Sequence, residues 1–237
     1  MFGLKVNELN DRIEVSFRKK PECWKRFASA LVKDRVILDI TNGINFLKNK
    51  GDVEVYQVFH FEIKNLSCDF TLLRHGIMST SKIGEPFLTY GHVHEKYKGE
   101  AYHVIKNDCF FQLSDITNYK TFFIHMKEGN SIFIHPNFLH RIISYKRDCL
   151  VFNFVPKDAG HDYNKVKNRG FPFHVIYNLE KDKISFVKNK KYSGGEFKFL
   201  DGMESENPIK IFKKSKSELI HILENPDKHR KIYFKGL

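Results

Sequence analysis

The chain has 237 residues, of which 41% are hydrophobic and 14% aromatic, so its composition excludes a disordered chain. Its length is sufficient to bury a core without disulfides, and no apolar run approaches the roughly 20 residues that a membrane helix needs. The formal net charge is +12, spread over several short basic runs. Such charge reflects general composition more than a nucleic-acid site, although it would favour anionic partners such as phosphorylated metabolites.

The amino-terminal residues 1–48 predict a mixed lead-in. Charged residues stand where a signal peptide would be apolar, which favours a cytoplasmic location. A helix is predicted where apolar residues share one face behind a proline: Pro21, Trp24, Phe27, Ala28 and Leu31. Residues 35–40 predict a strand that ends in a Thr-Asn-Gly turn at 41–43.

From residue 52 the hydrophobic period changes to two, which is typical of β-strands. After the alternating segment 52–62, short strands are predicted at 69–74, 87–94, 100–106, 109–113, 120–125, 131–135, 139–145, 149–155, 173–178 and 184–188. Many short strands with little helix between them predict a β-sandwich or barrel over residues 49–190.

The carboxyl-terminal residues 191–237 form the third predicted region. The polar segment 188–197, which contains Gly194-Gly195, is the best candidate for a linker. Ser215 and Glu218 match a capping box, and an apolar stripe follows before Pro226, so a short helix is predicted there.

The cysteines are far apart and form no Cys-x-x-Cys pair: Cys23, Cys68, Cys109 and Cys149. This spacing gives no support to a thiolate zinc site or a redox motif, and free thiols are expected. Cys68 and Cys109 lie among strand-like apolar residues and are expected in the core.

A candidate metal site begins with His92 and His94. Residues two apart on a strand point to the same face, so these imidazoles can reach one ion. Glu100, at the start of the next predicted strand, can return a carboxylate to it, and His140 supplies a fourth ligand from another strand. Three imidazoles and one carboxylate suit Fe(II), Mn(II), Ni(II) or Zn(II).

Two other residues compete for this role, and chance also has to be considered. His135 and Glu95 are rival ligands, but Glu95 directly follows His94 and should face away. In a histidine-rich chain His-x-His can also arise without function, and the offsets of Glu100 and His140 weigh against chance.

A second polar group follows the apolar run CLVFNFV. Residues 156–163 place His161, Asp162 and Tyr163 in a loop after this predicted strand. Such a loop can deliver side chains to the mouth of a cavity, or it can be a turn with an incidental histidine.

Three segments, in this order and spacing, resemble the cupin-type glucose-6-phosphate isomerase family. They are GHVHEKYKGEAY at 91–102, HPNFLHR at 135–141 and VPKDAGHDYNKVKNRGF at 155–171. The Asp-Ala-Gly-His-Asp-Tyr stretch is the most specific, and the resemblance covers roughly residues 50–190. It implies a mainly β fold, a cupin (jelly-roll) barrel, here with short helical extensions at both ends.

The resemblance also implies a ligand set and a substrate pocket. His92, His94, Glu100 and His140 would hold one divalent metal ion per chain, with Fe(II) favoured. A sugar phosphate would lie across the barrel mouth, its phosphate near Thr71 and the Thr89-Tyr90-Gly91-His92 stretch. The pocket would also be lined by Tyr56, Tyr102, His161 and Tyr163. Strict alternation puts Thr89 opposite His92, so phosphate contact there requires Gly91 to break the strand or has to run through the backbone.

The implied activity is metal-dependent interconversion of glucose 6-phosphate and fructose 6-phosphate. Glu100 is the candidate proton shuttle, unless a hydride shift occurs, and His161 with Tyr163 would assist ring opening. The alternatives are isomerisation of another phosphorylated sugar such as mannose 6-phosphate, an iron-dependent oxygenase, and a nucleic-acid-binding module. We expect a homodimer with neither a membrane nor nucleic acid as partner.

Overall fold

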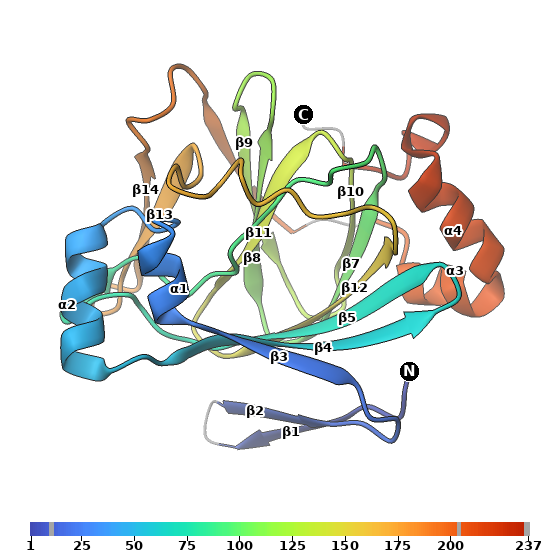
Figure 1. The fold of residues 1–237 in the computed structure, drawn as a ribbon, viewed down its shortest axis with the longest axis horizontal. Helices are drawn as coiled ribbons and strands as arrows, with labels where there is room; N and C mark the ends of the chain where they lie inside the picture. Colours follow the sequence, from blue (N-terminus) through green and yellow to red (C-terminus); the bar gives the residue numbers. More distant parts are fainter. Residues whose placement is uncertain (10–11, 203–204, 235–237) are drawn as a thin grey trace.

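Two β-sheets enclose the main hydrophobic core of the computed structural model, which describes residues 1–9, 12–202 and 205–234 (Figure 1). The larger sheet has the strand order β10-β7-β12-β5-β4-β3. Its strands are β3 (Glu22–Phe27), β4 (Glu54–Ile63), β5 (Leu66–Leu73), β7 (Glu100–Lys106), β10 (Ser131–Ile134) and β12 (Cys149–Pro156).

The opposing sheet has the order β11-β8-β9-β15, and a smaller sheet of order β14-β13-β6 closes one end. Their strands are β6 (Ile83–Gly84), β8 (Cys109–Asp115), β9 (Thr121–Met126), β11 (Phe138–Ser144), β13 (Phe173–Asn178), β14 (Lys183–Lys188) and β15 (Phe197–Asp201). The prediction of a mainly β barrel with helical extensions at both ends is confirmed.

The two faces of the larger sheet have different environments because side chains alternate along each strand. On β5, Thr71 and Leu73 face the barrel interior, whereas Phe70 and Leu72 pack in a second core outside it. That outer core is covered by the hairpin β1 (Lys5–Leu9) and β2 (Arg12–Ser16) and by helices α3 (Pro208–Lys214) and α4 (Lys216–Glu224), followed by the short helix η1 (Pro226–His229).

The amino-terminal predictions were wrong in two places. Residues 22–27 form strand β3 rather than a helix, and helix α1 (Ala28–Lys33) begins only after it. The helical spacing of apolar residues was outweighed by pairing of β3 with β4. Residues 35–40 form no strand, and the expected turn at 41–43 lies inside helix α2 (Ile40–Lys50), which the Asp39 side chain caps.

The carboxyl-terminal helix was predicted correctly, whereas the linker at 188–197 stays a prediction. Ser215 caps α4 by accepting a hydrogen bond from the Glu218 backbone N–H at 3.2 Å. In the expected linker Tyr192 is buried and donates to the Gly170 carbonyl at 2.7 Å, and the chain then enters β15, which pairs with β9.

The proposed domain boundaries at residues 48 and 190 stay a prediction. Strands β3 and β15 lie outside these boundaries and extend the two barrel sheets. All four cysteines are free thiols; Cys23 is exposed and the others are buried. Among the described residues, no helix has the length and apolar character required to cross a membrane.

Candidate active site

Four ligand side chains converge inside the barrel. Glu100 is the first residue of β7, His140 lies on β11, and His92 with His94 lies on the segment that precedes β7. One ligand atom from each of these four residues lies within 4.8 Å of the others. The four predicted ligands therefore come together, from parts of the chain up to 48 residues apart.

Gly91 explains how these histidines are placed. The predicted strand at 87–94 is broken: the segment makes only isolated bridges, and Gly91 has a φ of +81°. A Cβ atom there would lie 2.6 Å from the Phe171 ring and 2.9 Å from the His140 carbonyl oxygen. Glycine is therefore required at this position both by its backbone angle and by its close packing.

Backbone contacts fix the orientation of two of the imidazoles. The Nδ1 atoms of His94 and His140 donate to the carbonyls of Lys98 at 2.5 Å and Phe138 at 3.1 Å. With Nδ1 used in this way, Nε2 of each ring is directed at the centre of the cluster. Such contacts to the outer nitrogen are typical of metal-binding histidines.

The Glu100 carboxylate is buried and held as an anion. Nε2 of His94 lies 3.1 Å and Nε2 of His140 lies 2.9 Å from its Oε2 atom, and the Asn153 amide donates to its Oε1 atom at 2.6 Å. Burial alone would raise the pKa of Glu100, but the hydrogen bonds from His140 and His94 hold it well below its usual range.

His92 shows that the cluster fits a cation. Its Nε2 atom is buried and has no hydrogen-bond partner among the described residues. Burial, then the neighbouring His140 and His161 rings, lowers the pKa of His92 well below its usual value, so the ring is neutral. An unpartnered imidazole lone pair beside a buried carboxylate is what a divalent ion such as Fe(II) or Zn(II) would satisfy.

The rival ligands lie elsewhere. Nε2 of His135 is 3.2 Å from the Tyr97 hydroxyl and 3.6 Å from the Asp227 carboxylate, and Glu95 is exposed. Neither joins the metal-ligand cluster found among the described residues.

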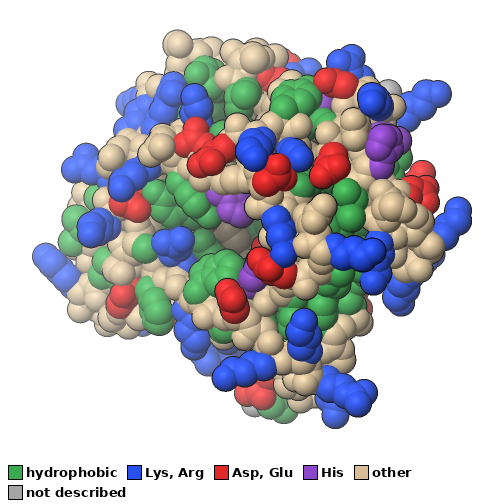
Figure 2. Space-filling model, turned by 45° about the vertical axis from the view of Figure 1, so that its right-hand side comes forward, with side chains coloured by type: hydrophobic (Ala, Val, Ile, Leu, Met, Phe, Trp, Pro, Cys, Tyr) green, Lys and Arg blue, Asp and Glu red, His purple; other side chains and the backbone are tan. Residues whose placement is uncertain are grey.

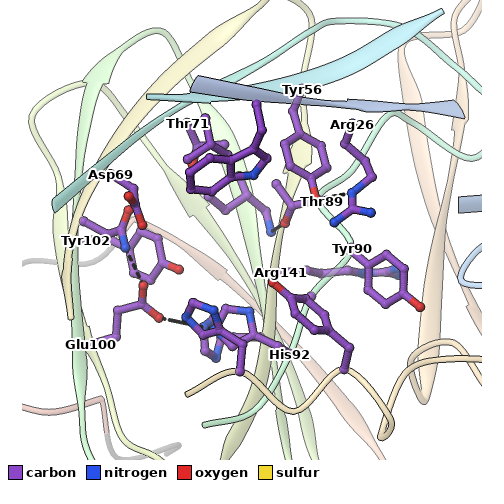
Figure 3. Close-up of a pocket in the computed structure, with 18 residues that line it drawn as sticks. Arg26, Tyr56, Asp69, Thr71, Thr89, Tyr90, His92, Glu100, Tyr102 and Arg141 are labelled. Carbon is purple, nitrogen blue, oxygen red and sulfur yellow. Dashed lines mark hydrogen bonds and ion pairs between the residues drawn. The ribbon is translucent and has the colours of Figure 1, made fainter. Parts of the chain in front are cut away.

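A pocket opens above the cluster and contains the predicted substrate residues (Figure 3). Figure 2 shows histidine side chains at a hollow whose rim has hydrophobic, acidic and basic side chains. Each predicted catalytic and substrate-binding residue lines this pocket: Tyr56, Thr71, Thr89, Gly91, Glu100, Tyr102, His161 and Tyr163. Of the predicted ligands, His94 alone is not among the lining residues, because it lies behind the others.

The loop after β12 brings His161 and Tyr163 to the mouth. Backbone hydrogen bonds of 2.8 Å and 3.4 Å join Asp162 to Val93 and tie the loop to the histidine segment. The His161 ring centroid lies 4.2 Å from that of His92, and the Tyr163 centroid lies 5.3 Å from that of Tyr90. The loop is thus part of the cavity wall rather than an incidental turn.

Comparison with known proteins shows the family of this chain. Residues 31–193 match the family described as glucose-6-phosphate isomerase (GPI), which is more than half of the chain. The chain belongs to the glucose-6-phosphate isomerase family.

Relatives in this isomerase family include archaeal proteins. The chain is 30% identical over 146 residues to the glucose-6-phosphate isomerase of Thermococcus litoralis, covering 60% of this chain and 75% of that one. Identity to the Pyrococcus abyssi protein of the same name is 30% over 149 residues, covering 62% and 77%. Among solved structures, the formate complex of Lactobacillus farciminis oxalate decarboxylase is similar over 44% of this chain and 29% of its own, with a TM-score of 0.35 and 14% identity.

Sequence reasoning missed several residues of this isomerase-family pocket. They are Trp24, Val58, Asp69, Ile142, Asn153 and two arginines, Arg26 and Arg141. Asn153 had a visible signal, since it is the one amide in the apolar run of β12. Trp24 and Arg26 were hidden because their segment was assigned to a helix, in which residues two apart do not share a face.

Proposed function

We propose that this chain interconverts glucose 6-phosphate and fructose 6-phosphate with one divalent metal ion. The observation that carries the proposal is the convergence of His92, His94, Glu100 and His140 at the floor of a pocket in a member of this family. We favour Fe(II), with Mn(II), Ni(II) and Zn(II) as alternatives, because this ligand set accepts each of them.

A bound divalent ion would act as a Lewis acid that lowers the energy of negative charge on the two oxygens of the reacting carbons. The residues of the chain supply the remaining chemistry. Glu100 takes the proton from C2 of the open-chain aldose and returns it to C1, while a hydroxyl proton moves from O2 to O1. The carboxylate is ionised and lines the pocket, so it can accept a proton, while its hydrogen bonds with His94, His140 and Asn153 make it a weak base.

The tyrosines act as hydrogen-bond donors. Burial and the nearby Glu100 carboxylate raise the pKa of Tyr102 well above its usual value, and burial raises the pKa of Tyr163 to about 12. Both phenols therefore stay protonated at neutral pH and can donate to sugar oxygens. His161, at the mouth beside Tyr163, moves the proton that opens the sugar ring.

The substrate is tested with metal-loaded protein supplied with fructose 6-phosphate, glucose 6-phosphate and mannose 6-phosphate side by side. The proposal expects the highest kcat/KM with the first two. A higher value with mannose 6-phosphate would transfer the function to the other candidate isomerase.

The route of the hydrogen is tested in deuterium oxide. Proton transfer through Glu100 incorporates deuterium into the product at carbon, whereas a hydride shift leaves the carbon-bound hydrogen in place. Deuterium in the product would therefore support the role of Glu100, and its absence at every time point would replace that role by a hydride shift.

Three further proposals accompany the activity: a homodimer, a cytoplasmic location, and a division at residues 48 and 190. Light scattering on the purified chain tests the first. The Lys and Arg side chains on the face in Figure 2 are dispersed rather than gathered in one patch, which agrees with our expectation that nucleic acid is not a partner.

A further inference from the structure

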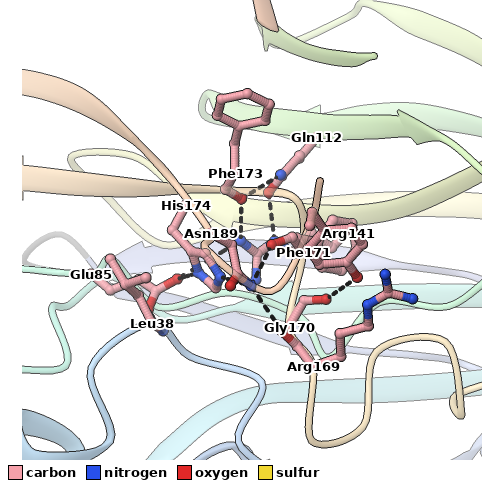
Figure 4. Close-up of polar contacts among 11 residues, drawn as sticks. Leu38, Glu85, Gln112, Arg141, Arg169, Gly170, Phe171, Phe173, His174 and Asn189 are labelled. Carbon is pink, nitrogen blue, oxygen red and sulfur yellow. Dashed lines mark hydrogen bonds and ion pairs between the residues drawn. The ribbon is translucent and has the colours of Figure 1, made fainter. Parts of the chain in front are cut away.

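The pocket contains two arginines, and they have different surroundings. Arg141 is fully buried, its Nε donates to the Gln112 side chain at 2.7 Å, and its guanidinium carbon lies 4.2 Å from the Phe171 ring centroid. The Glu85 carboxylate is 3.7 Å away and balances the charge (Figure 4). Among the described residues its Nη1 atom has no hydrogen-bond partner, and the side chain has 0% exposure.

Arg26, on β3, has no such counter-charge. Its Nε donates to the Tyr56 hydroxyl at 3.3 Å, and its guanidinium carbon lies 5.5 Å from the Tyr90 ring centroid. Among the described residues no carboxylate forms an ion pair with it, and its two terminal nitrogens make no hydrogen bond. The preceding residue Lys25 points to the opposite face and pairs with Glu54 at 2.7 Å.

The charges in the pocket are separated along its length (Figure 3). Asp69 and Glu100 lie at one end, whereas Arg26 lies at the other with Thr89 and Tyr90. The Thr89 hydroxyl oxygen accepts a hydrogen bond from the Ile142 backbone N–H at 2.9 Å, so its proton remains available to donate. The Tyr90 hydroxyl is used here, because it donates to the Asp34 carboxylate at 3.1 Å. This end therefore offers an unpaired cation, Arg26, and the Thr89 hydroxyl to an anionic group.

We propose that Arg26 binds the phosphate group of the substrate and thereby directs the reacting carbons toward His92 and Glu100. A guanidinium presents a planar fork of donors that matches phosphate geometry, and charge-assisted hydrogen bonds of this kind are the strong ones. The identity of the ligand as a sugar phosphate rests on the proposed function. Arg26 lies outside residues 31–193, the part of the chain that matches the family.

Trp24 provides a test that does not depend on turnover. It is the single tryptophan of the chain and lines the same pocket two residues before Arg26. Its fluorescence is titrated with fructose 6-phosphate and with inorganic phosphate, in metal-loaded wild type and in R26M, R26K and the matched control K25M. KM and kcat for fructose 6-phosphate are measured on the same proteins, with metal content and melting temperature as checks of the fold.

In R26M, Kd and KM for fructose 6-phosphate should rise on the order of 10- to 100-fold. The change of Trp24 fluorescence on addition of inorganic phosphate should be abolished. R26K should lie between R26M and wild type, because lysine keeps the charge without the fork. K25M should stay within about twofold of wild type, since it loses a charge on the other face of the strand. Metal content should be equal in all four proteins.

Unchanged binding of both ligands in folded R26M would overturn the assignment. Weaker fructose 6-phosphate binding with inorganic phosphate unaffected would also overturn it, because Arg26 would then act on pocket shape through Tyr56. If wild type binds both ligands through Arg26 but turns over no sugar phosphate, the inference stands and the isomerase proposal fails. If kcat/KM for fructose 6-phosphate is equal in wild type and R26M, the isomerase proposal stands and the assignment of Arg26 fails.

Discussion

Among the described residues, two buried clusters in this barrel place a carboxylate against histidine, and the one around Glu100 is a candidate metal site. Around Glu85, the His174 Nδ1 atom and the Leu38 backbone N–H donate to the carboxylate, each at 2.6 Å (Figure 4). The Asn189 amide donates to the other nitrogen of His174 at 3.3 Å. Both the carboxylate and the imidazole are therefore used by neighbouring protein groups.

The Glu100 cluster differs in having a ligand atom left over. Nε2 of His92 has no hydrogen-bond partner among the described residues, and Glu100, His92 and His140 face a pocket. Outward nitrogens of two rings are fixed by carbonyls, so the inner ones converge. The contrast indicates what distinguishes a binding site from a structural hydrogen-bond network. It is a ligand atom without a hydrogen-bond partner and an opening to a pocket, rather than the residue types alone.

The largest expected effect comes from Glu100→Gln. The amide keeps a ligand oxygen but cannot accept a proton, so turnover should fall roughly 10²- to 10⁴-fold while part of the metal is retained. The coupled isomerase assay and metal analysis of the same sample measure both quantities. Glu95→Gln, an exposed carboxylate on the same segment, is the matched control. Full activity of Glu100→Gln would exclude it as the base.

Glu85→Gln should lower the stability of the fold and leave the metal site intact. It removes the anion that faces His174 and Arg141 inside the barrel, and breaking a buried charge pair is strongly destabilising. We expect the free energy of unfolding at pH 7 to fall by about 3–5 kcal/mol, with metal content unchanged. Urea denaturation and metal analysis test this, and loss of metal without loss of stability would contradict the distinction between the two clusters.

Wild type and Glu85→Gln should also differ in how their stability depends on pH. Burial alone would raise the pKa of Glu85, but His174 and Arg141 outweigh it and hold that pKa below the unfolded value. A depressed pKa contributes stability that is present above about pH 4.5 and is lost as pH falls through the folded pKa. Wild type should therefore lose more stability than Glu85→Gln between pH 5 and pH 3. Parallel curves would show that Glu85 is not held in this way.

Tyr163→Phe is expected to have the smallest effect. It removes one hydroxyl at the mouth and leaves the ligand cluster intact, so kcat/KM should fall about 3- to 10-fold with metal content unchanged. Tyr119→Phe, a tyrosine outside the pocket, serves as control. A loss as large as that of Glu100→Gln would place Tyr163 at the centre of the chemistry instead.

Much of the barrel could be predicted from sequence because its strands carry their own signal. Segments such as 100–106 and 149–155 are short, apolar and bounded by turns, and they match β7 and β12 closely. The four ligands were predicted because their types are rare in apolar strands. Their convergence required only that 92–94, Glu100 and His140 face one interior, although the segment 87–94 is not a regular strand.

The remaining features depend on contacts that the hydrophobic period of a segment does not reveal. β3 becomes a strand by pairing with β4, about 30 residues away, and this pairing brings Trp24 and Arg26 to the pocket. The strand predicted at 35–40 failed because α2 is stabilised by a cap at Asp39 and by packing of Gly43 against Ile37 and Val32. Local periodicity contains neither of these contacts.

The central claim is that the His92 cluster binds a metal ion required for isomerisation. The most direct measurement strips the protein with a chelator, resupplies Fe(II), Mn(II), Ni(II) or Zn(II), and follows glucose 6-phosphate formed from fructose 6-phosphate by its coupled oxidation. We predict no turnover after stripping and recovery with at least one ion, at one ion per chain. Full turnover in the stripped protein, or none with any ion bound at that stoichiometry, would contradict the account.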